Sequence, residues 1–291
     1  MIRYLTPVAV ASLLIASCTG GTNTNNMTTT TINPLCKSGY SDVNGIRMYY
    51  EIYGEGQPLL LIHGGGSTIQ SSFGRLIPAL SKQRQVVAIE MQAHGRTTDR
   101  DAPESFEQDA DDAAALINNL GLGKADILGY SNGGNTAMLV AVRHPEVVNK
   151  LVVASAFYKR EGLPQGFFEG MANATINDMP KALQDAFLAV NPDSSKLQNM
   201  FNKDRERMLH FQDWNPEILR SIKAPALIIS GDQDVASAGH VAEMAALIPS
   251  SRLLILPAQH GSYIGVIESP PAGKGVFDIT VEVISDFLDR K

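Results

Sequence analysis

The five residues Gly129-Tyr130-Ser131-Asn132-Gly133 decide the fold of this chain. They read Gly-x-Ser-x-Gly and lie between an apolar stretch at 125–128 and a helix-forming stretch at 136–142. A serine at such a sharp strand-to-helix turn takes a strained backbone conformation, and the flanking glycines let neighbouring chain segments pass without a Cβ clash. The pattern predicts a nucleophilic serine at position 131, with the N–H groups of the following helix available to an oxyanion.

Apolar runs and helix-forming runs alternate along the chain from residue 40 onward. We expect strands at residues 46–53, 58–63, 86–90, 125–129, 150–154, 226–230 and 252–256. We expect helices at residues 67–81, 105–120, 132–143, 236–247 and 277–289. Alternating strand–helix units of this kind predict an α/β fold, with a mostly parallel sheet and helices on both of its faces.

Local signals support several of these boundaries. Asn44-Gly45 between short apolar runs predicts a hairpin turn. Ser105 and Gln108 are spaced as a capping box, and Gly121 ends the helix that they begin. Pro78 is expected to cap or kink the helix at 67–81, because proline lacks a backbone N–H.

Residues 156–223 break the alternation, since they contain no buried-strand run. Helical patterns occur at 180–190 and 200–211, so we interpret the whole stretch as a helical insertion. Ligands of open α/β sheets bind beyond the carboxyl ends of the strands. The insertion is therefore expected to cap the binding site and to determine the choice of substrate.

A serine hydroxyl needs a base within hydrogen-bond reach, and that base needs a carboxylate to orient it. On a strand-to-helix elbow the chain order is serine, then acid, then histidine. Asp232 and Asp234 both follow one predicted strand, and His260 follows the last predicted strand. Because the carboxyl ends of parallel strands share one edge of a sheet, we expect these residues to meet Ser131 there. On this reasoning either aspartate can fill the acid position.

Oxyanion donors are expected from two places. One is the backbone N–H of Asn132, directly after the serine. The other is the run His63-Gly64-Gly65-Gly66, whose glycines let the backbone approach a tetrahedral oxygen closely.

The motifs together resemble those of the α/β-hydrolase family, over roughly residue 40 to the C-terminus. They occur in the family's order: His63-Gly64-Gly65-Gly66, His94-Gly95-Arg96, Gly129-Tyr130-Ser131-Asn132-Gly133-Gly134, Gly231-x-x-Asp234 and His260. The resemblance implies that Ser131 is the nucleophile, Asp234 the acid and His260 the base. It also implies that Gly65 and Asn132 supply the oxyanion N–H groups.

Family spacing favours Asp234 over Asp232, which would then be a capping or turn residue. Two departures from the family pattern stand out. Glu90-Met91-Gln92-Ala93 occupies the place where the family more often has Asp-x-Arg-Gly, which concerns a turn more than the chemistry. Asn132 replaces the more usual Met, Leu or Gln, which bears on substrate choice.

The remaining histidines are interpreted as structural, with His63 and His94 as braces of their loops and His210 as a candidate substrate contact from the cap. The aromatic residues of the insertion, Phe167, Phe168 and Trp214, are interpreted as packing residues. No Cys/His/Asp cluster has metal-ligand spacing, and no cofactor is expected. A formal net charge of −6 argues against nucleic acid as a partner, because phosphate binding needs a basic surface.

The N-terminus reads as a targeting segment rather than as part of the fold. Arg3 precedes a short apolar stretch at 5–16, and Leu14-Ile15-Ala16-Ser17-Cys18 resembles a bacterial lipobox. We expect a signal peptide at 1–17, lipidated Cys18 with a flexible tether at 18–39, and a domain at 40–291 held to the membrane in the bacterial cell envelope. An ordinary signal peptide with an incidental cysteine is the alternative.

Our interpretation of the whole chain is a serine hydrolase that cleaves a small carboxylic ester through an acyl-enzyme. One alternative is carbon–carbon bond hydrolysis or cofactor-free perhydrolysis on the same three residues, since both occur in the resembling family. The other is a binding lipoprotein that keeps the fold without catalysis.

Overall fold

The computed structural model describes residues 35–273 and 275–290. All of the described residues belong to one compact unit. Among the described residues, no helix is both long and apolar enough to span a bilayer. The predictions for the signal peptide and for Cys18 lie outside the described residues.

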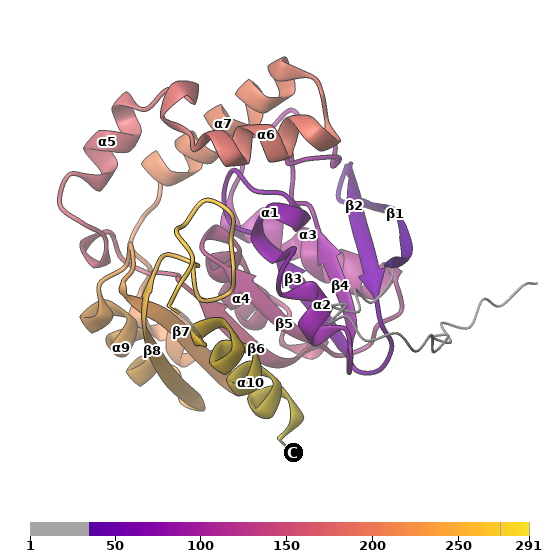
Figure 1. The fold of residues 1–291 in the computed structure, drawn as a ribbon, viewed down its shortest axis with the longest axis vertical. Helices are drawn as coiled ribbons and strands as arrows, with labels where there is room; N and C mark the ends of the chain where they lie inside the picture. The colour runs from indigo at the N-terminus through magenta and orange to yellow at the C-terminus, as the bar shows by residue number, and fades with distance from the viewer. Residues whose placement is uncertain (1–34, 274, 291) are drawn as a thin grey trace, which may run out of the picture. The chain divides into compact units, whose positions relative to one another are not determined.

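A single eight-stranded sheet forms the centre of this unit, in the order β1-β2-β4-β3-β5-β6-β7-β8 (Figure 1). The strands are β1 Leu35–Val43, β2 Ile46–Tyr53, β3 Pro58–Ile62, β4 Gln85–Ile89, β5 Ala125–Tyr130, β6 Val148–Ala154, β7 Ala226–Gln233 and β8 Ser251–Gln259. β2 pairs antiparallel with β1 and with β4, and all other neighbours are parallel. The predicted fold class, an α/β fold with a mostly parallel sheet, is confirmed.

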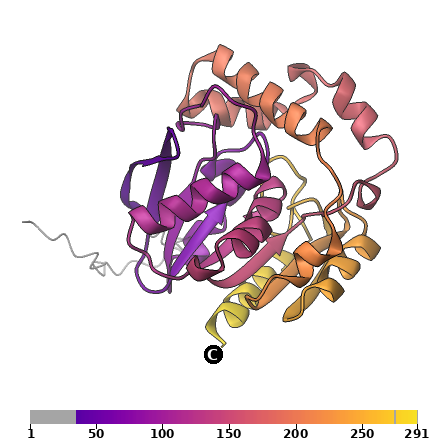
Figure 2. The same ribbon diagram turned by 180° about the vertical axis from the view of Figure 1, so that it is seen from behind.

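Helices cover both faces of the sheet (Figures 1 and 2). They are α1 Ile69–Phe73, α2 Ile77–Leu80, α3 Phe106–Asn119, α4 Asn132–Arg143, α5 Phe167–Asn173, α6 Lys181–Val190, α7 Ser194–Leu209, α8 Pro216–Arg220, α9 Ala238–Leu247 and α10 Val276–Asp289. Short 3₁₀ turns lie at Pro145–Val147, Arg160–Gly162 and Ile176–Asp178. One face of the sheet is covered by α3, α4, α8 and α9, and the other by α1, α2 and α10.

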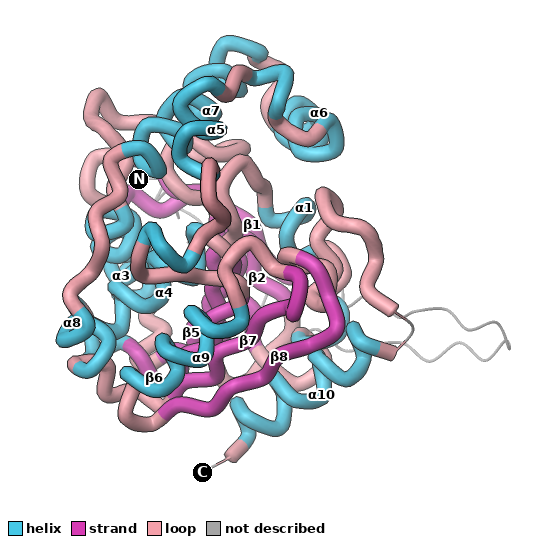
Figure 3. The backbone as a smooth tube through the Cα atoms, turned by 90° about the vertical axis from the view of Figure 1, so that its left-hand side faces the viewer, coloured by secondary structure: helices cyan, strands magenta, loops and turns pink. Residues whose placement is uncertain are grey.

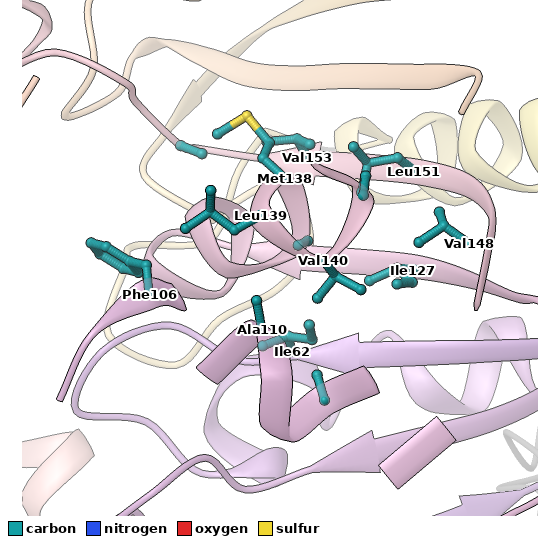
Figure 4. Close-up of a cluster of buried hydrophobic side chains, with 14 of the residues drawn as sticks. Ile62, Phe106, Ala110, Ile127, Met138, Leu139, Val140, Val148, Leu151 and Val153 are labelled. Atoms are coloured by element: carbon teal, nitrogen blue, oxygen red, sulfur yellow. The ribbon is translucent and has the colours of Figure 1, made fainter. Parts of the chain in front are cut away.

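Side-chain alternation along the strands divides the core between these two layers. In β5, Ile127 packs with the layer of α3 and α4, whereas Leu128 packs with the layer of α1 and α10. Figure 4 shows part of the first cluster, where Val140 of α4 lies among strand residues. β3, β5 and the carboxyl-terminal part of β6 are buried on both faces, which explains why they read as continuous apolar runs in the sequence.

The first hairpin begins earlier than predicted. Asn44 and Gly45 form the expected turn with positive φ angles, and β1 pairs with β2 on its other side. β1 starts at Leu35, so residues 35–39 belong to the sheet and the predicted tether at 18–39 is wrong over these residues. The sequence concealed this strand because its polar residues lie at an exposed edge of the sheet.

Two helix predictions need correction. The stretch 67–81 is two short helices rather than one, because the first ends at Gly74 and Pro78 lies in the first turn of a new helix. Ser105 caps α3 by accepting from the backbone N–H of Gln108, but the Gln108 side chain donates to Asp112 instead of closing a capping box. Gly121 follows the helix with a positive φ, as predicted.

Between β6 and β7 the described chain contains only helices and turns, as predicted for the insertion. Helices α5, α6 and α7 lie together beyond the carboxyl ends of the strands (Figures 1 and 3), and we call these three helices the cap. α8 lies elsewhere, since it packs between α4 and α9 and contributes Leu219 to the main core. The part of the insertion that covers the strand ends therefore stops before α8.

Candidate active site

The turn between β5 and α4 has the strained geometry that the sequence predicts. Ser131 has φ 53° and ψ −122°, a conformation that side-chain-bearing residues rarely take. A Cβ at Gly129 would lie 2.0 Å from the carbonyl oxygen of Gly133, and a Cβ at Gly133 would lie 2.1 Å from that of Ile62. Only glycine fits at both positions, so the tight turn presents the Ser131 side chain at the end of the sheet.

Three of the predicted site residues meet at this edge. His260 Nε2 lies 3.1 Å from Ser131 Oγ, and His260 Nδ1 lies 2.5 Å from Asp234 Oδ1. Asp232 points elsewhere, because its carboxylate accepts from the backbone N–H of Ala258 at 3.0 Å and ties β7 to β8. The structure thus brings Ser131, Asp234 and His260 together and gives Asp232 a place in the turn.

The carboxylate of Asp234 is buried and has hydrogen bonds on both oxygens. Besides His260, its donors are the hydroxyls of Ser155 (2.6 Å) and Ser230 (2.9 Å) and the backbone N–H groups of Gly231 (3.1 Å) and Val235 (2.7 Å). Burial alone would raise the pKa of Asp234, but His260 and these donors outweigh it and lower the pKa to about 2. Asp234 is therefore ionised at neutral pH and held in one orientation.

Sequence reasoning missed Ser155, which directly follows β6. Its hydroxyl contacts both Asp234 and the hydroxyl of Tyr263, at 2.6 and 2.7 Å, and its φ of 56° is positive. Tyr263 is fully buried and donates to the carbonyl of Ile229. Its position in the sequence could have identified it, because Ser155 directly follows a central strand, at the edge of the sheet where the other site residues were expected.

Two further residues, Tyr130 and Glu268, lie on one side of His260. The ring of Tyr130 lies with its centroid 5.1 Å from that of His260, and the Tyr130 hydroxyl donates to Glu268 at 3.0 Å. Burial raises the pKa of the Glu268 carboxyl. Neither residue carried a sequence signal for this contact, since Glu268 lies in a loop after β8.

The run Gly64–Gly66, which we call the oxyanion loop, passes beside Ser131 and the first turn of α4. Asn132 begins that helix, and its side-chain nitrogen would lie 2.5 Å from a Cβ placed on Gly65. The structure therefore places the two residues predicted to supply oxyanion donors, Gly65 and Asn132, next to each other, and both line the same cavity as Ser131.

The interpretation of His63 and His94 as loop braces agrees with their contacts. His63 Nδ1 donates to the carbonyl of Gly64 at 2.7 Å, and its Nε2 accepts from the N–H of Met91 at 3.0 Å. That pattern requires a neutral ring, and burial next to His94 lowers the pKa of His63 to about 3. His94 Nδ1 donates to the carbonyl of Gln92 at 2.7 Å.

The unusual residue Glu90 is a structural element of its turn, as expected. It is fully buried and accepts from the backbone N–H and from the guanidinium of Arg96, each at 2.7 Å. Burial raises the pKa of Glu90, and Arg96 opposes that rise.

A cavity of about 300 Å³ lies between Ser131 and the cap. Its walls are mainly apolar side chains, among them Phe157, Leu163, Phe167, Met179, Leu183 and Met200, and its charged residues are Asp178, Asp204 and Arg205. Phe167 therefore borders the cavity, whereas Phe168 stacks on Arg160 and Trp214 packs against Phe106, as predicted for packing residues. The predicted contact of His210 with substrate is not seen, because His210 is exposed and lies outside this cavity.

The described residues contain no group of three or more His, Cys, Asp or Glu side chains that could hold a metal ion.

Residues 57–199 match the family model described as alpha/beta hydrolase fold. The chain is 30% identical to the human serine hydrolase BPHL over 202 residues, which is 66% of this chain and 68% of that protein. The chain belongs to the α/β-hydrolase fold family. It is a hydrolase of this fold, and its nucleophile elbow lies within the matched range.

Two further matches are a curated relative and a solved structure. The chain is 26% identical to the 2-hydroxy-6-oxo-6-(2'-aminophenyl)hexa-2,4-dienoic acid hydrolase of Metapseudomonas resinovorans, over 79% of this chain and 86% of that protein. Its fold is similar to the crystal structure of a serine hydrolase involved in carbazole degradation, with a TM-score of 0.71 at 24% identity, covering 87% of this chain and 98% of the other.

Proposed function

We propose that this α/β hydrolase cleaves a small carboxylic ester through a covalent acyl-enzyme on Ser131. The observation that carries the proposal is the continuous contact from Ser131 Oγ to His260 and from His260 to a buried, ionised Asp234, beneath an apolar cavity. A binding protein has no need of all three groups in this geometry, which argues against the non-catalytic alternative.

Each group has a defined task in this mechanism. His260 Nε2 takes the proton of Ser131 as Oγ attacks the carbonyl carbon, and Asp234 holds the tautomer and stabilises the imidazolium. The N–H groups of Gly65 and Asn132 stabilise the oxyanion. His260 then protonates the leaving alkoxide, and water repeats the sequence on the acyl-enzyme.

The charges in the cavity favour an uncharged acyl group. Of the two carboxylates in its wall, Asp178 repels an acid, whereas the charge of Asp204 is compensated by His94 and Arg207. Two nitrogens of the Arg205 guanidinium are already engaged, because Nη1 donates to the carbonyl of Ala174 at 3.2 Å and Nη2 donates to Glu206 at 2.7 Å. We therefore expect neutral esters of short to medium acyl chains to be better substrates than esters of dicarboxylic acids.

Fluorophosphonate labelling of the full-length chain tests the activated serine, with Ser131→Ala as control. Labelling at Ser131 that disappears in the control and falls sharply in His260→Ala supports the mechanism. A folded chain that is not labelled contradicts it. A series of p-nitrophenyl esters from acetate to octanoate then measures acyl-chain preference through kcat/KM.

Carbon–carbon bond hydrolysis is the second candidate, favoured by the dienoic acid hydrolase among the relatives. Such a substrate carries a carboxylate, and Arg205 Nε is the one group of the cavity that suits it, because this nitrogen is buried and has no hydrogen-bond partner among the described residues. Turnover of a 2-hydroxy-6-oxo-dienoate at a higher kcat/KM than any ester, lost in Arg205→Gln, would favour this reaction. Peracid formation from acetate and peroxide tests the perhydrolase alternative in the same way.

We also propose that the chain is a lipoprotein of the bacterial cell envelope, anchored through Cys18. The support is the apolar stretch at 5–16 followed by Leu14-Ile15-Ala16-Ser17-Cys18. Metabolic labelling with a fatty acid, compared between the wild type and Cys18→Ala, tests the anchor. Equal labelling of both chains would exclude it.

A further inference from the structure

A carboxylate of the cap reaches into the oxyanion loop. Asp204 belongs to α7, but its Oδ2 accepts from the backbone N–H of Gly66 at 2.5 Å, across 138 positions of sequence. Its Oδ1 lies 3.5 Å from the side-chain nitrogen of Asn132, the residue directly after Ser131. A single side chain of the cap thus contacts both segments that carry the oxyanion donors.

The Asp204 carboxylate is held firmly by two cations. His94 Nε2 lies 3.0 Å from Oδ2, and Arg207 donates to Oδ1. His94 Nε2 also lies 3.2 Å from the backbone N–H of Gly66, and His94 Nδ1 donates to the carbonyl of Gln92 at 2.7 Å. Burial alone would lower the pKa of His94, but Asp204 outweighs it and raises the pKa to about 9.

Arg207 links this group to the core of the sheet domain. Its guanidinium donates to Asp109 of α3 at 2.7 Å, and both side chains are buried. Asp204 is therefore fixed to the body of the enzyme through Arg207 as well as through His94. A carboxylate with so few degrees of freedom can fix the backbone that donates to it.

The oxyanion loop needs such support because it consists of glycines. Gly66 has a φ of 68°, and Gly65 has no side chain to restrict its rotation. The peptide between them is held at both ends, since its N–H donates to Asp204 and its carbonyl accepts from the hydroxyl of Ser67 at 3.4 Å. A Cβ on Gly65 would lie 2.5 Å from Asn132 Nδ2, so the Asn132 side chain closes the remaining space.

We propose that Asp204, together with the side chain of Asn132, is a positioning residue that holds the oxyanion loop in its working conformation. The inference rests on the proposed acyl transfer and deepens it, because it makes seating of the cap a condition for stabilising the transition state. It also gives a physical reason for asparagine after the nucleophile.

A purely pocket-shaping role of Asp204 makes a different prediction. If Asp204 only shaped the cavity, its loss would change KM for long acyl chains that touch the cap and leave short ones unaffected. If it positions the oxyanion loop, kcat falls for every ester, because the interaction concerned is made in the transition state.

The test compares Asp204→Asn with Asp193→Asn in the full-length chain. Asparagine at 204 cannot replace the carboxylate. Oδ2 contacts Gly66 and His94, and Oδ1 contacts Asn132 and Arg207. In asparagine an NH₂ group takes the place of one of these oxygens, so it would face donors instead of accepting from them. Asp193 is an exposed residue at the start of the same helix, where it accepts from the N–H of Ser195, and asparagine caps a helix equally well.

We expect Asp204→Asn to lower kcat for p-nitrophenyl acetate by about 30-fold, less than the 10²–10³ lost when a donor is removed outright, with KM changed less than threefold. The inhibition constant of a trifluoromethyl ketone, whose adduct carries the oxyanion, should rise by a similar factor. Asp193→Asn should match the wild type in both measurements. An unchanged kcat for the acetate ester, with a raised KM only for the octanoate ester, would overturn the proposal.

If Asp204→Asn does not fold, Asn132→Ala provides a second test of the positioning role. It keeps the backbone N–H of residue 132 and the buried ion pairs of Asp204, and it removes only the side chain beside Gly65. We expect a roughly fivefold fall in kcat for the acetate ester, a fraction of the effect of losing a donor, and an unchanged kcat would overturn the proposal. A wild-type chain that is neither labelled at Ser131 nor active on any ester is a failure of the proposed function instead.

Discussion

Replacing Asp234 by asparagine should impair catalysis while leaving the shape of the site intact. Oδ1 of the carboxylate faces His260 and the N–H of Val235, and Oδ2 faces two serine hydroxyls and the N–H of Gly231. Hydroxyls can rotate to accept a hydrogen bond, but backbone N–H groups cannot. The NH₂ group of the new asparagine therefore favours the position of Oδ2. There the one donor that it meets and that cannot rotate away is the backbone N–H of Gly231, at 3.1 Å.

The size of the loss follows from these contacts. With the amide oxygen still on His260 the tautomer is kept, and the negative charge is lost. The contacts that stabilise this charge lower the pKa of Asp234 from 3.8 to about 2, and a shift of that size corresponds to about 60-fold. With the NH₂ group on His260 the tautomer is reversed, which lowers kcat by about 10⁴. We expect kcat/KM to fall between these limits.

Ester hydrolysis by full-length Asp234→Asn measures this loss, together with the thermal midpoint. Asp232→Asn is the matched control, because Asp232 accepts only from the N–H of Ala258, which an amide oxygen can still do. It should stay within twofold of the wild type, as expected for a surface substitution. A folded Asp234→Asn chain with kcat/KM within about threefold of the wild type would refute the assignment of the acid.

Three further predictions concern stability. Gly133→Ala should lower the free energy of unfolding by about 3 kcal/mol or more, because the new Cβ meets rigid backbone at 2.1 Å. Arg84→Ala should lower it by about 3–5 kcal/mol, because Asp126 would remain buried without its partner at 2.7 Å. The folded-state pKa of Asp234 lies below its ordinary value, so Asp234 contributes roughly 2 kcal/mol above pH 4 that is lost as the pH falls towards 2.

Urea denaturation followed through the fluorescence of Trp214, the only tryptophan, measures all three effects. Gly170→Ala serves as the control for Gly133→Ala, since a Cβ on Gly170 meets nothing within 4 Å. Unchanged midpoints for Gly133→Ala or Arg84→Ala would contradict the packing described here. An acid dependence of stability that is the same in the wild type and in Asp234→Asn would contradict the third prediction.

The sequence alone determined the order of most of the strands and helices, and most of the site. Apolar runs mark the buried strands because parallel strands are covered on both faces. The elbow is a local feature, since the glycines at 129 and 133 are required by contacts that the turn itself creates. Once the sheet is parallel, its carboxyl edge brings Ser131 and His260 together, although 129 positions separate them.

Other features had weak local signals or none. β1 was missed because an exposed edge strand needs no apolar run, and the choice between Asp232 and Asp234 needed the family's spacing until side-chain directions were known. Residues 67–81 were predicted to form a single helix, because the spacing of their apolar residues does not indicate the break at Gly74.

Only the tertiary structure decided which distant side chains support the site. Ser155 reaches Asp234 across 79 positions, and Asp204 reaches Gly66 across 138. Such contacts depend on how loops and cap helices pack against the sheet, and no period or spacing in the chain encodes that packing. A serine after a strand or an aspartate on a helix is an ordinary polar residue until burial removes water and leaves a particular backbone N–H or carboxylate as its partner.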